Sequence, residues 1–172
     1  MIRYAMLLFA GLLVLDTVSC AATTQHQVVA ATATAAVAAD LAVSDAFDAA
    51  AEAAYVEVDS QGVVGDEGFE AWCAAVGPTY EVLTRIECAI TDLGRLVLVG
   101  GRLVESDPEE VEWLAWFAEV APVVGAILNH WTEVADPPPE LVNLWDLLRN
   151  VFPGAEPGVL PTDCAVGPVP GC

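Results

Sequence analysis

Five cysteines are the residues of this chain whose type and spacing point most directly to chemistry: Cys20, Cys73, Cys88, Cys164 and Cys172. Cys20 follows an apolar N-terminal run, and the other four lie further along the chain. An even number of cysteines in an exported chain is typical of a disulfide framework, and four cysteines allow three pairings. The sequence therefore predicts two disulfides among the last four cysteines.

The spacing of these four cysteines favours one pairing. Cys73 and Cys88 are fifteen residues apart, which is roughly 22 Å along stacked helical segments and too far for a bond between them. Cys164 and Cys172 are eight residues apart in a proline-rich stretch, where an extended chain spans roughly 25 Å. Because the two spans agree, and because the expected bundle starts the tail near the level of Cys88, we expect Cys88 to pair with Cys164 and Cys73 with Cys172. A local Cys164–Cys172 loop, with the other two thiols free or otherwise paired, is the alternative.

The remaining residues show no pattern of catalysis or metal binding. The sequence contains no Gly-x-Ser-x-Gly elbow, phosphate-binding loop, dinucleotide fingerprint or His-Glu-x-x-His helix. Its histidines are His26 and His130, and the paired Glu-x-x-His segments of a di-iron bundle are missing. We therefore expect no enzyme activity, catalytic residue, metal site, cofactor or small-molecule substrate. For His130 we expect a hydrogen bond near a helix end.

The charge balance limits the class of protein. The 172 residues include 25 Asp and Glu against 5 Lys and Arg, which gives a net charge of −20, and 56% of the residues are apolar. A disordered acidic tail would contain few apolar residues, and a nucleic-acid-binding protein would need a basic face. Because the length fits one domain, we expect a single acidic domain with a solvated surface that binds no nucleic acid.

The first twenty residues have the pattern of a secretory signal. Arg3 precedes an apolar run over residues 4–15, which has the length of a signal-peptide core and is too short to span a bilayer. Small residues then precede Cys20, although Thr17 stands where leucine is usual in the corresponding motif. This segment resembles the lipobox of bacterial lipoproteins.

The resemblance implies that the chain is cut after Ser19 and that Cys20 carries palmitate-type acyl chains, at least two of which anchor a protein stably. Residues 1–19 would then form the signal peptide and residues 20–23 a lipid-anchored tether. Ala21 is not the aspartate associated with inner-membrane retention, so we expect an outer-membrane lipoprotein that faces the periplasm or the cell surface. A soluble periplasmic or secreted protein, released by an ordinary signal peptidase, is the alternative.

Helical patterns fill the middle of the chain. Residues 24–59 are alanine-rich and contain no glycine or proline, which predicts a long first helix. A second helix is expected from Phe69, with a kink or a break at Gly77–Pro78, because proline disrupts a helix interior. Within its pattern, Gly100 and Gly101 favour either a close helix approach or fraying of the helix end.

The third helix has the clearest predicted start. Asp107 can accept the orphan amide hydrogen bonds, Pro108 suits the first helical position, and Glu110 lies three residues after the cap. A short fourth helix is expected over residues 140–151, after the proline-rich stop at residues 136–139. The third helix is expected to turn one apolar stripe inward: Trp113, Leu114, Phe117, Val120, Val124, Ile127 and Trp131.

These patterns predict an all-α fold, an up-and-down bundle of three long helices and one short helix over residues 24–151. An extended Pro/Gly-rich tail over residues 152–172 follows, and the disulfides would hold it along the second helix. Trp116 lies beside Trp113 and cannot fully share its face, so we expect Trp116 to contact a partner or a membrane. The uninterrupted apolar runs of the mature chain are shorter than the roughly 20 residues of a membrane span, which argues against a pore former.

The whole pattern resembles small uncharacterised bacterial lipoproteins, some of them phage-encoded, with an N-terminal signal peptide and a lipobox-like cysteine. The resemblance implies a non-catalytic interaction or scaffold module of the cell envelope. Such a module would be held at the membrane by its lipid and would bind an envelope protein partner. A membrane-active lysis or pore-associated accessory protein of prophage origin is the alternative.

Overall fold

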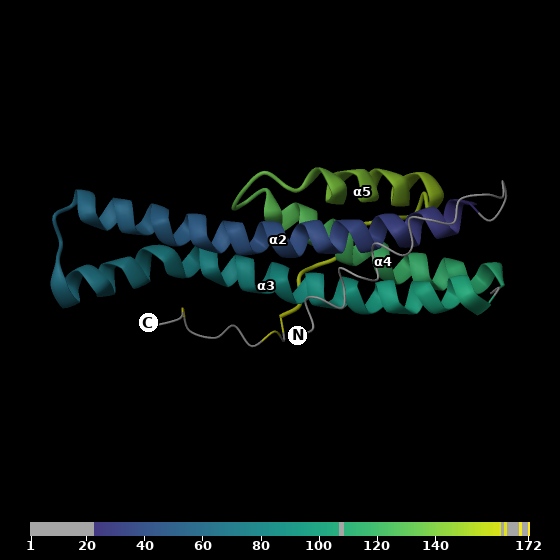
Figure 1. The fold of residues 1–172 in the computed structure, drawn as a ribbon, viewed down its shortest axis with the longest axis horizontal. Helices are drawn as coiled ribbons and strands as arrows, with labels where there is room; N and C mark the ends of the chain where they lie inside the picture. The colour runs from purple at the N-terminus through teal and green to yellow at the C-terminus, as the bar shows by residue number, and fades with distance from the viewer. Residues whose placement is uncertain (1–22, 107–108, 163, 165–168, 170–171) are drawn as a thin grey trace.

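The structure is a computed structural model that describes residues 23–106, 109–162, 164, 169 and 172. These residues form four α-helices and no β-strand: α2 (Thr23–Ser60), α3 (Gly65–Ser106), α4 (Glu110–Trp131) and α5 (Pro139–Val151) (Figure 1). The predicted all-α class is confirmed for this part of the chain. The predicted signal peptide, residues 20–22 of the predicted tether and the predicted cap Asp107 lie outside the described residues, and Thr23, which was expected in the tether, begins α2.

The helices α2 and α3 form a long antiparallel hairpin that sets the length of the molecule (Figure 1). Gly62 and Gly65, with φ of 69° and 70°, turn the chain between the two helices. Glycine enters this left-handed backbone region without the penalty of a Cβ atom. A Cβ atom on Gly68 would lie 2.8 Å from the carbonyl oxygen of Val63, so the turn packs closely on the start of α3. The free end of the hairpin, residues 55–72, is the hairpin tip.

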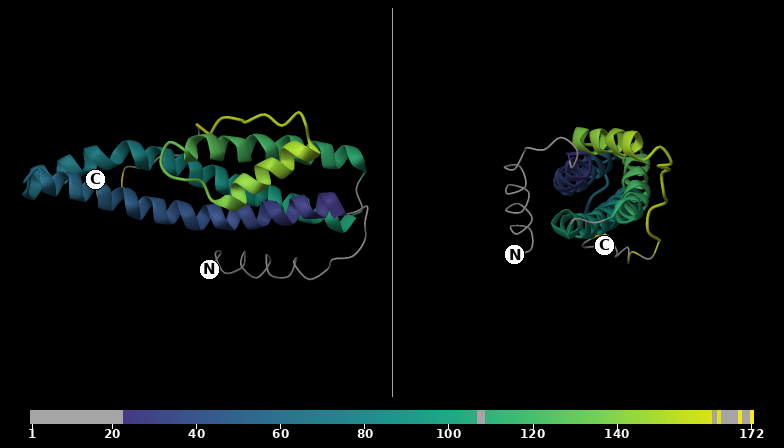
Figure 2. Two further views of the ribbon diagram at one scale, coloured as in Figure 1. Left: turned by 90° about the horizontal axis from the view of Figure 1, so that it is seen from above. Right: turned by 90° about the vertical axis from the view of Figure 1, so that its right-hand side faces the viewer.

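The helices α4 and α5 cover the half of the hairpin that contains the start of α2 (Figures 1 and 2). Each helix runs antiparallel to the one before it, and the packed pairs are α2 with α3, α3 with α4, α4 with α5 and α5 with α2. The view along the long axis shows the four helices placed around a common centre (Figure 2). The hairpin tip extends beyond α4 and α5.

The hydrophobic core lies where the four helices meet, and its largest fully buried side chains include Leu83, Ile86, Leu93, Ile127, Trp131, Leu141, Leu144 and Leu148. Burial of each aliphatic side chain of this size contributes about 1.5–3 kcal/mol. On α2 the core positions are mostly alanine and valine, which allow the neighbouring helices to approach closely. Thr32 is buried among them, and its hydroxyl donates to the Val28 carbonyl at 2.7 Å, so this polar group is paired.

The second helix is longer than the sequence pattern predicts. It begins at Gly65 instead of Phe69 and continues through Pro78 without ending. A proline inside a helix leaves the carbonyl four residues earlier without its usual donor. Here that residue is Ala74, which is exposed, so water can bond its carbonyl and the helix is not interrupted.

The start of α4 also differs from the prediction. The cap residue is Glu109 instead of Asp107, and the Glu112 carboxylate accepts a hydrogen bond from the Glu109 backbone N–H at 2.9 Å. This is one of the two bonds of a capping box, displaced along the chain by two residues. Leu114, which was expected to point inward, is 45% exposed, because it lies a full 100° around the helix from the buried Trp113.

Candidate functional site

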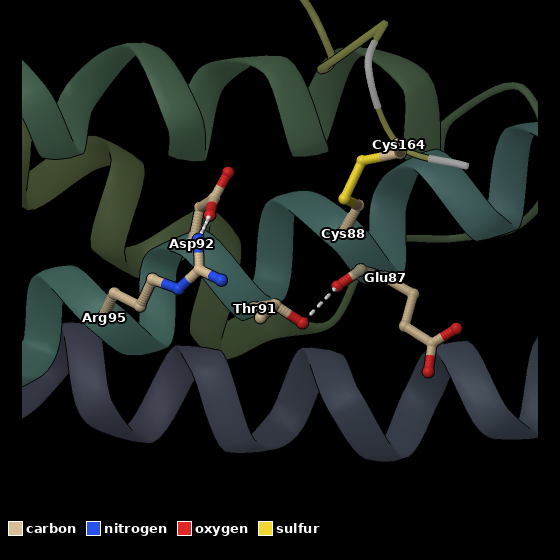
Figure 3. A network of polar contacts seen from close by, with 6 residues as sticks. All are labelled: Glu87, Cys88, Thr91, Asp92, Arg95 and Cys164. Carbon is tan, nitrogen blue, oxygen red and sulfur yellow. Dashed lines mark hydrogen bonds and ion pairs between the residues drawn. A yellow bond between two sulfur atoms is a disulfide. The ribbon is translucent and has the colours of Figure 1, made fainter. Parts of the chain in front are cut away.

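The structure brings two cysteines of the C-terminal segment onto α3. Cys164 lies against Cys88 with their Cα atoms 6.4 Å apart, and Cys172 lies against Cys73 with their Cα atoms 5.9 Å apart. Both Cα distances fall in the range of disulfide bonds, and both pairs are joined through their sulfur atoms, as Figure 3 shows for Cys88 and Cys164. These are the two pairs that the residue spacing favours over a local loop.

The two disulfides are nested in sequence. Cys88–Cys164 joins residues 76 apart, and Cys73–Cys172 encloses it with a separation of 99. The inner bond therefore closes a ring that contains all of α4 and α5. By the loop-entropy relation, one bond across a ring of this size removes about 4–5 kcal/mol of conformational freedom from the unfolded chain.

The segment after α5 is seated on α4 before it reaches α3. The backbone N–H of Gly158 donates to the Pro122 carbonyl at 2.9 Å, and Leu160 is buried in the core. A Cβ atom on Gly125 would lie 2.6 Å from the Cα atom of Pro157, so Gly125 makes room for the backbone of this segment. Backbone packing on α4 and covalent bonds to α3 together fix its path.

The polar side chains beside Cys88 contact one another within α3. Arg95 donates to the Asp92 carboxylate at 2.7 Å, and the Thr91 hydroxyl donates to the Glu87 carbonyl at 3.1 Å (Figure 3). The Arg95 side chain is largely exposed, and an exposed ion pair of this kind contributes at most about 1 kcal/mol. These contacts order one helix surface and bring together no nucleophile, base and acid.

The two histidines lie on different helices. His26 is exposed in the first turn of α2, whereas Nδ1 of His130 lies 2.9 Å from the Ala126 carbonyl oxygen in the last turn of α4. The hydrogen bond expected for His130 is therefore present. Across residues 23–106 and 109–162, the structure places no group of three His, Cys, Asp or Glu side chains where they could hold a metal ion.

Trp116, for which a contact with a partner or a membrane was expected, is buried among the helices instead. Its side chain is only 2% exposed, and its indole N–H donates to the Leu96 carbonyl of α3 at 2.8 Å. The ring packs against Trp113 and Phe117. Trp116 and Trp113 share the inward side because α4 lies against two neighbours, α3 and α5, so its buried face is wider than a single stripe.

Among the described residues, two helices are long and apolar enough to cross a membrane, judged by length and composition alone: α2, over Thr24–Ser60, and α4, over Glu110–Trp131. The uninterrupted apolar runs within these helices are shorter than a membrane span. In each of these helices about half of the most apolar window is buried inside the protein. The core helix of a water-soluble protein has the same property.

The sequence patterns did not predict a groove at the hairpin tip. An open apolar groove lies at the hairpin tip, between the end of α2 and the start of α3, and Tyr55, Phe69 and Trp72 contribute its aromatic side chains. The position of Tyr55 in the sequence could have indicated this groove. Tyr55 lies off the apolar stripe of its helix, and acidic residues lie one turn before it and one turn after it. A large apolar residue on the polar face of a helix is the pattern to look for.

Comparison with known proteins gives no match: the chain is matched by no protein-family model, no curated protein and no solved structure. Its function is therefore inferred from the cysteine pairs and from the surfaces of the helices.

Proposed function

We propose that this protein is an exported lipoprotein that acts as a non-catalytic interaction module of the cell envelope. In this proposal Cys20 carries the lipid and the four helices form an up-and-down bundle. Two disulfides bond the Pro/Gly-rich tail to this bundle. The single observation that carries the proposal is the pairing of Cys73 with Cys172 and Cys88 with Cys164.

The pairing supports export because of where disulfides persist. The two disulfides join cysteines that are 76 and 99 positions apart in the sequence. Such bonds form and persist in an oxidising compartment, such as the periplasm or the cell exterior. In the cytosol the thiols would stay reduced, and the C-terminal segment would lose both covalent attachments to α3. The two pairs use four of the five cysteines, and the fifth, Cys20, is the one that follows the apolar N-terminal run.

The shape of the hairpin supports an interaction role. The helix α2 has 38 residues and is therefore about 57 Å long at 1.5 Å per residue. It begins three residues after Cys20 and ends at the hairpin tip, beyond the reach of α4 and α5 (Figure 1). An anchor at one end of this helix would hold the tip far from the membrane, where a second protein can reach it.

Lipid attachment and oxidation are tested in one set of experiments. Cells grown with labelled palmitate are fractionated, and the labelled protein is mapped as peptides without reduction. We expect label in the membrane fraction that disappears in Cys20→Ala, together with peptides that link Cys73 to Cys172 and Cys88 to Cys164. Cys88→Ala is the matched control, because it removes a cysteine and should keep the label. An unlabelled protein with its initiating methionine and all five thiols free would overturn the proposal.

A second candidate function is a membrane-active accessory role in lysis or pore formation. It is favoured by the finding that α2 and α4 have the length and apolar composition of membrane spans. The purified protein would then release a dye from liposomes, and its helices would separate to expose the core. No dye release in either the oxidised or the reduced state would argue against it, because the helices would then stay packed even when the segment that the disulfides hold is freed.

A further inference from the structure

The hairpin tip carries an open apolar groove formed by both helices. Its apolar walls include Val58 and Tyr55 on α2, Val64 in the turn, and Phe69 and Trp72 on α3. We call this surface the tip groove. Tyr55 is 65% exposed, Val64 80% and Phe69 50%, so each of these three residues leaves half or more of its surface in water. No other helix covers this end of the hairpin in the described part of the chain (Figure 1).

The base of the tip groove is held in place by its own contacts. The indole N–H of Trp72 donates to the Ala51 carbonyl at 3.1 Å across the two helices. The Phe69 ring stacks on Trp72 with their centroids 6.1 Å apart. Because these contacts fix the rings before any ligand binds, little side-chain freedom remains to be lost on binding.

The tip groove lies in a part of the chain whose charged residues are all acidic. Residues 45–80 contain eight Asp and Glu and no Lys or Arg. Asp59 lines the groove, and Asp66 and Glu70 are exposed within one helical turn of Phe69. The arginines of the described residues lie outside this region: Arg85, Arg95, Arg102 and Arg149.

We propose that the tip groove binds a basic segment of another protein, in which an apolar side chain is flanked by lysine or arginine. The apolar side chain would fill the groove between Tyr55 and Phe69. The flanking cations would lie over the exposed aromatic rings and beside Asp59, Asp66 and Glu70, where both cation–π attraction and the opposite charges favour them.

The acidic surroundings disfavour acidic occupants of the groove. A second copy of the chain would place carboxylates against carboxylates, and an anionic lipid surface or a nucleic acid would also be repelled. This inference names the partner of the interaction module and rests on that proposed function. It can fail by itself, because the disulfides and the lipid are measured independently of peptide binding.

The probe is a short amphipathic peptide of lysine and leucine, compared with a peptide of the same pattern in which glutamate replaces lysine. Binding to the purified full chain is followed at physiological salt through the indole N–H signals of the tryptophans, assigned by Trp→Phe variants. Trp72 lies at the hairpin tip, and the other four are Trp113, Trp116, Trp131 and Trp145 in the covered half. We expect the lysine peptide to shift the Trp72 signal and the glutamate peptide to shift none.

A pair of variants locates the binding surface. The double variant Tyr55→Ser with Phe69→Ser should weaken binding of the lysine peptide about tenfold or more, since buried aromatic anchors dominate such interfaces. The control is Leu41→Ser with Leu98→Ser, which removes two similarly exposed side chains from the same two helices away from the groove. Val64→Ser, in the turn, tests the same surface without altering either helix and should weaken binding about threefold.

Charge is tested in the same way. The double variant Asp66→Asn with Glu70→Gln should weaken binding of the lysine peptide. The control, Glu105→Gln with Glu119→Gln, removes the same charge elsewhere and should leave binding unchanged. The proposal is overturned if the lysine peptide does not bind, if the shifts fall on the other tryptophans, or if the control variants lose as much affinity as the groove variants. Self-association that the groove variants abolish would instead assign the surface to a second copy and also overturn it.

Discussion

The indole ring of Trp116 lies directly over Gly100. A Cβ atom on Gly100 would lie 2.7 Å from Cζ2 of Trp116 and 3.0 Å from a methyl carbon of Val29. Three helices therefore meet at a glycine, because Trp116 belongs to α4, Gly100 to α3 and Val29 to α2. The Trp116 N–H, bonded to Leu96 one turn earlier, fixes the ring at this point.

Substitution of Gly100 tests this junction. In Gly100→Ala the new methyl group would collide with a ring that its hydrogen bond prevents from moving, and we expect a loss of about 1–3 kcal/mol in the free energy of unfolding. The matched control is Gly101→Ala. No atom lies within 4 Å of its added Cβ, so the gain in helix propensity should stabilise it by up to about 1 kcal/mol. Urea unfolding measures both, and an equal effect of the two substitutions would contradict the packing described here.

Removal of the disulfides should have effects that do not add. Once one of the nested bonds is present, the other closes only the short ring formed by residues 73–88 and 164–172. Removing either bond alone should therefore lower the free energy of unfolding by about 3 kcal/mol. Removing both should cost about 7–8 kcal/mol, because the larger ring is then open as well. Denaturant unfolding of Cys73→Ala with Cys172→Ala, of Cys88→Ala with Cys164→Ala, and of the fourfold variant gives these three values. The reduced wild type is the control and should match the fourfold variant.

Parts of the fold could be predicted because the signals are local. The long helix of residues 24–59 follows from its alanine content and the absence of glycine and proline, and it corresponds to α2 within one residue at each end. The cysteine pairs follow from the agreement of two spans, one along a helix and one along an extended segment. The first inference needs only the geometry of a single element, whereas the second compares two elements and also needs the direction in which the tail meets the second helix.

Other parts depend on neighbours that the sequence does not identify. Whether Trp116 is buried depends on α3. There Gly100, which has no side chain, leaves room for the indole ring, and the Leu96 carbonyl accepts its hydrogen bond. Whether Pro78 ends a helix depends on the exposure of Ala74. The tip groove requires Tyr55 and Phe69 to come together from two helices, and the start of the second helix was expected at Phe69, four residues after the Gly65 at which it begins.

The seat of the C-terminal segment on α4 is tested at Gly125. A Cβ atom there would lie 2.6 Å from Pro157 Cα and 3.0 Å from the Trp145 ring. We expect Gly125→Ala to displace this segment and to lower the free energy of unfolding by about 1–3 kcal/mol. Hydrogen exchange of the Gly158 amide, which is bonded to the Pro122 carbonyl, should become faster. Gly154→Ala is the control, because its nearest neighbour lies at an ordinary contact distance of 3.9 Å. Protection of Gly158 that is equal in both variants would show that the small size of Gly125 is not needed to seat the segment on α4.

The start of α4 is tested by two substitutions at one residue. The Glu112 side chain accepts from the Glu109 N–H at 2.9 Å, so Glu112→Ala should cost about 1 kcal/mol of stability, whereas Glu112→Gln keeps an acceptor and should cost much less. The sequence pattern instead placed Glu110 in this role, three residues after Asp107. If Glu110→Ala proves the more damaging change in thermal unfolding, the helix begins two residues earlier than described, and the N–H groups of its first turn are satisfied by Asp107.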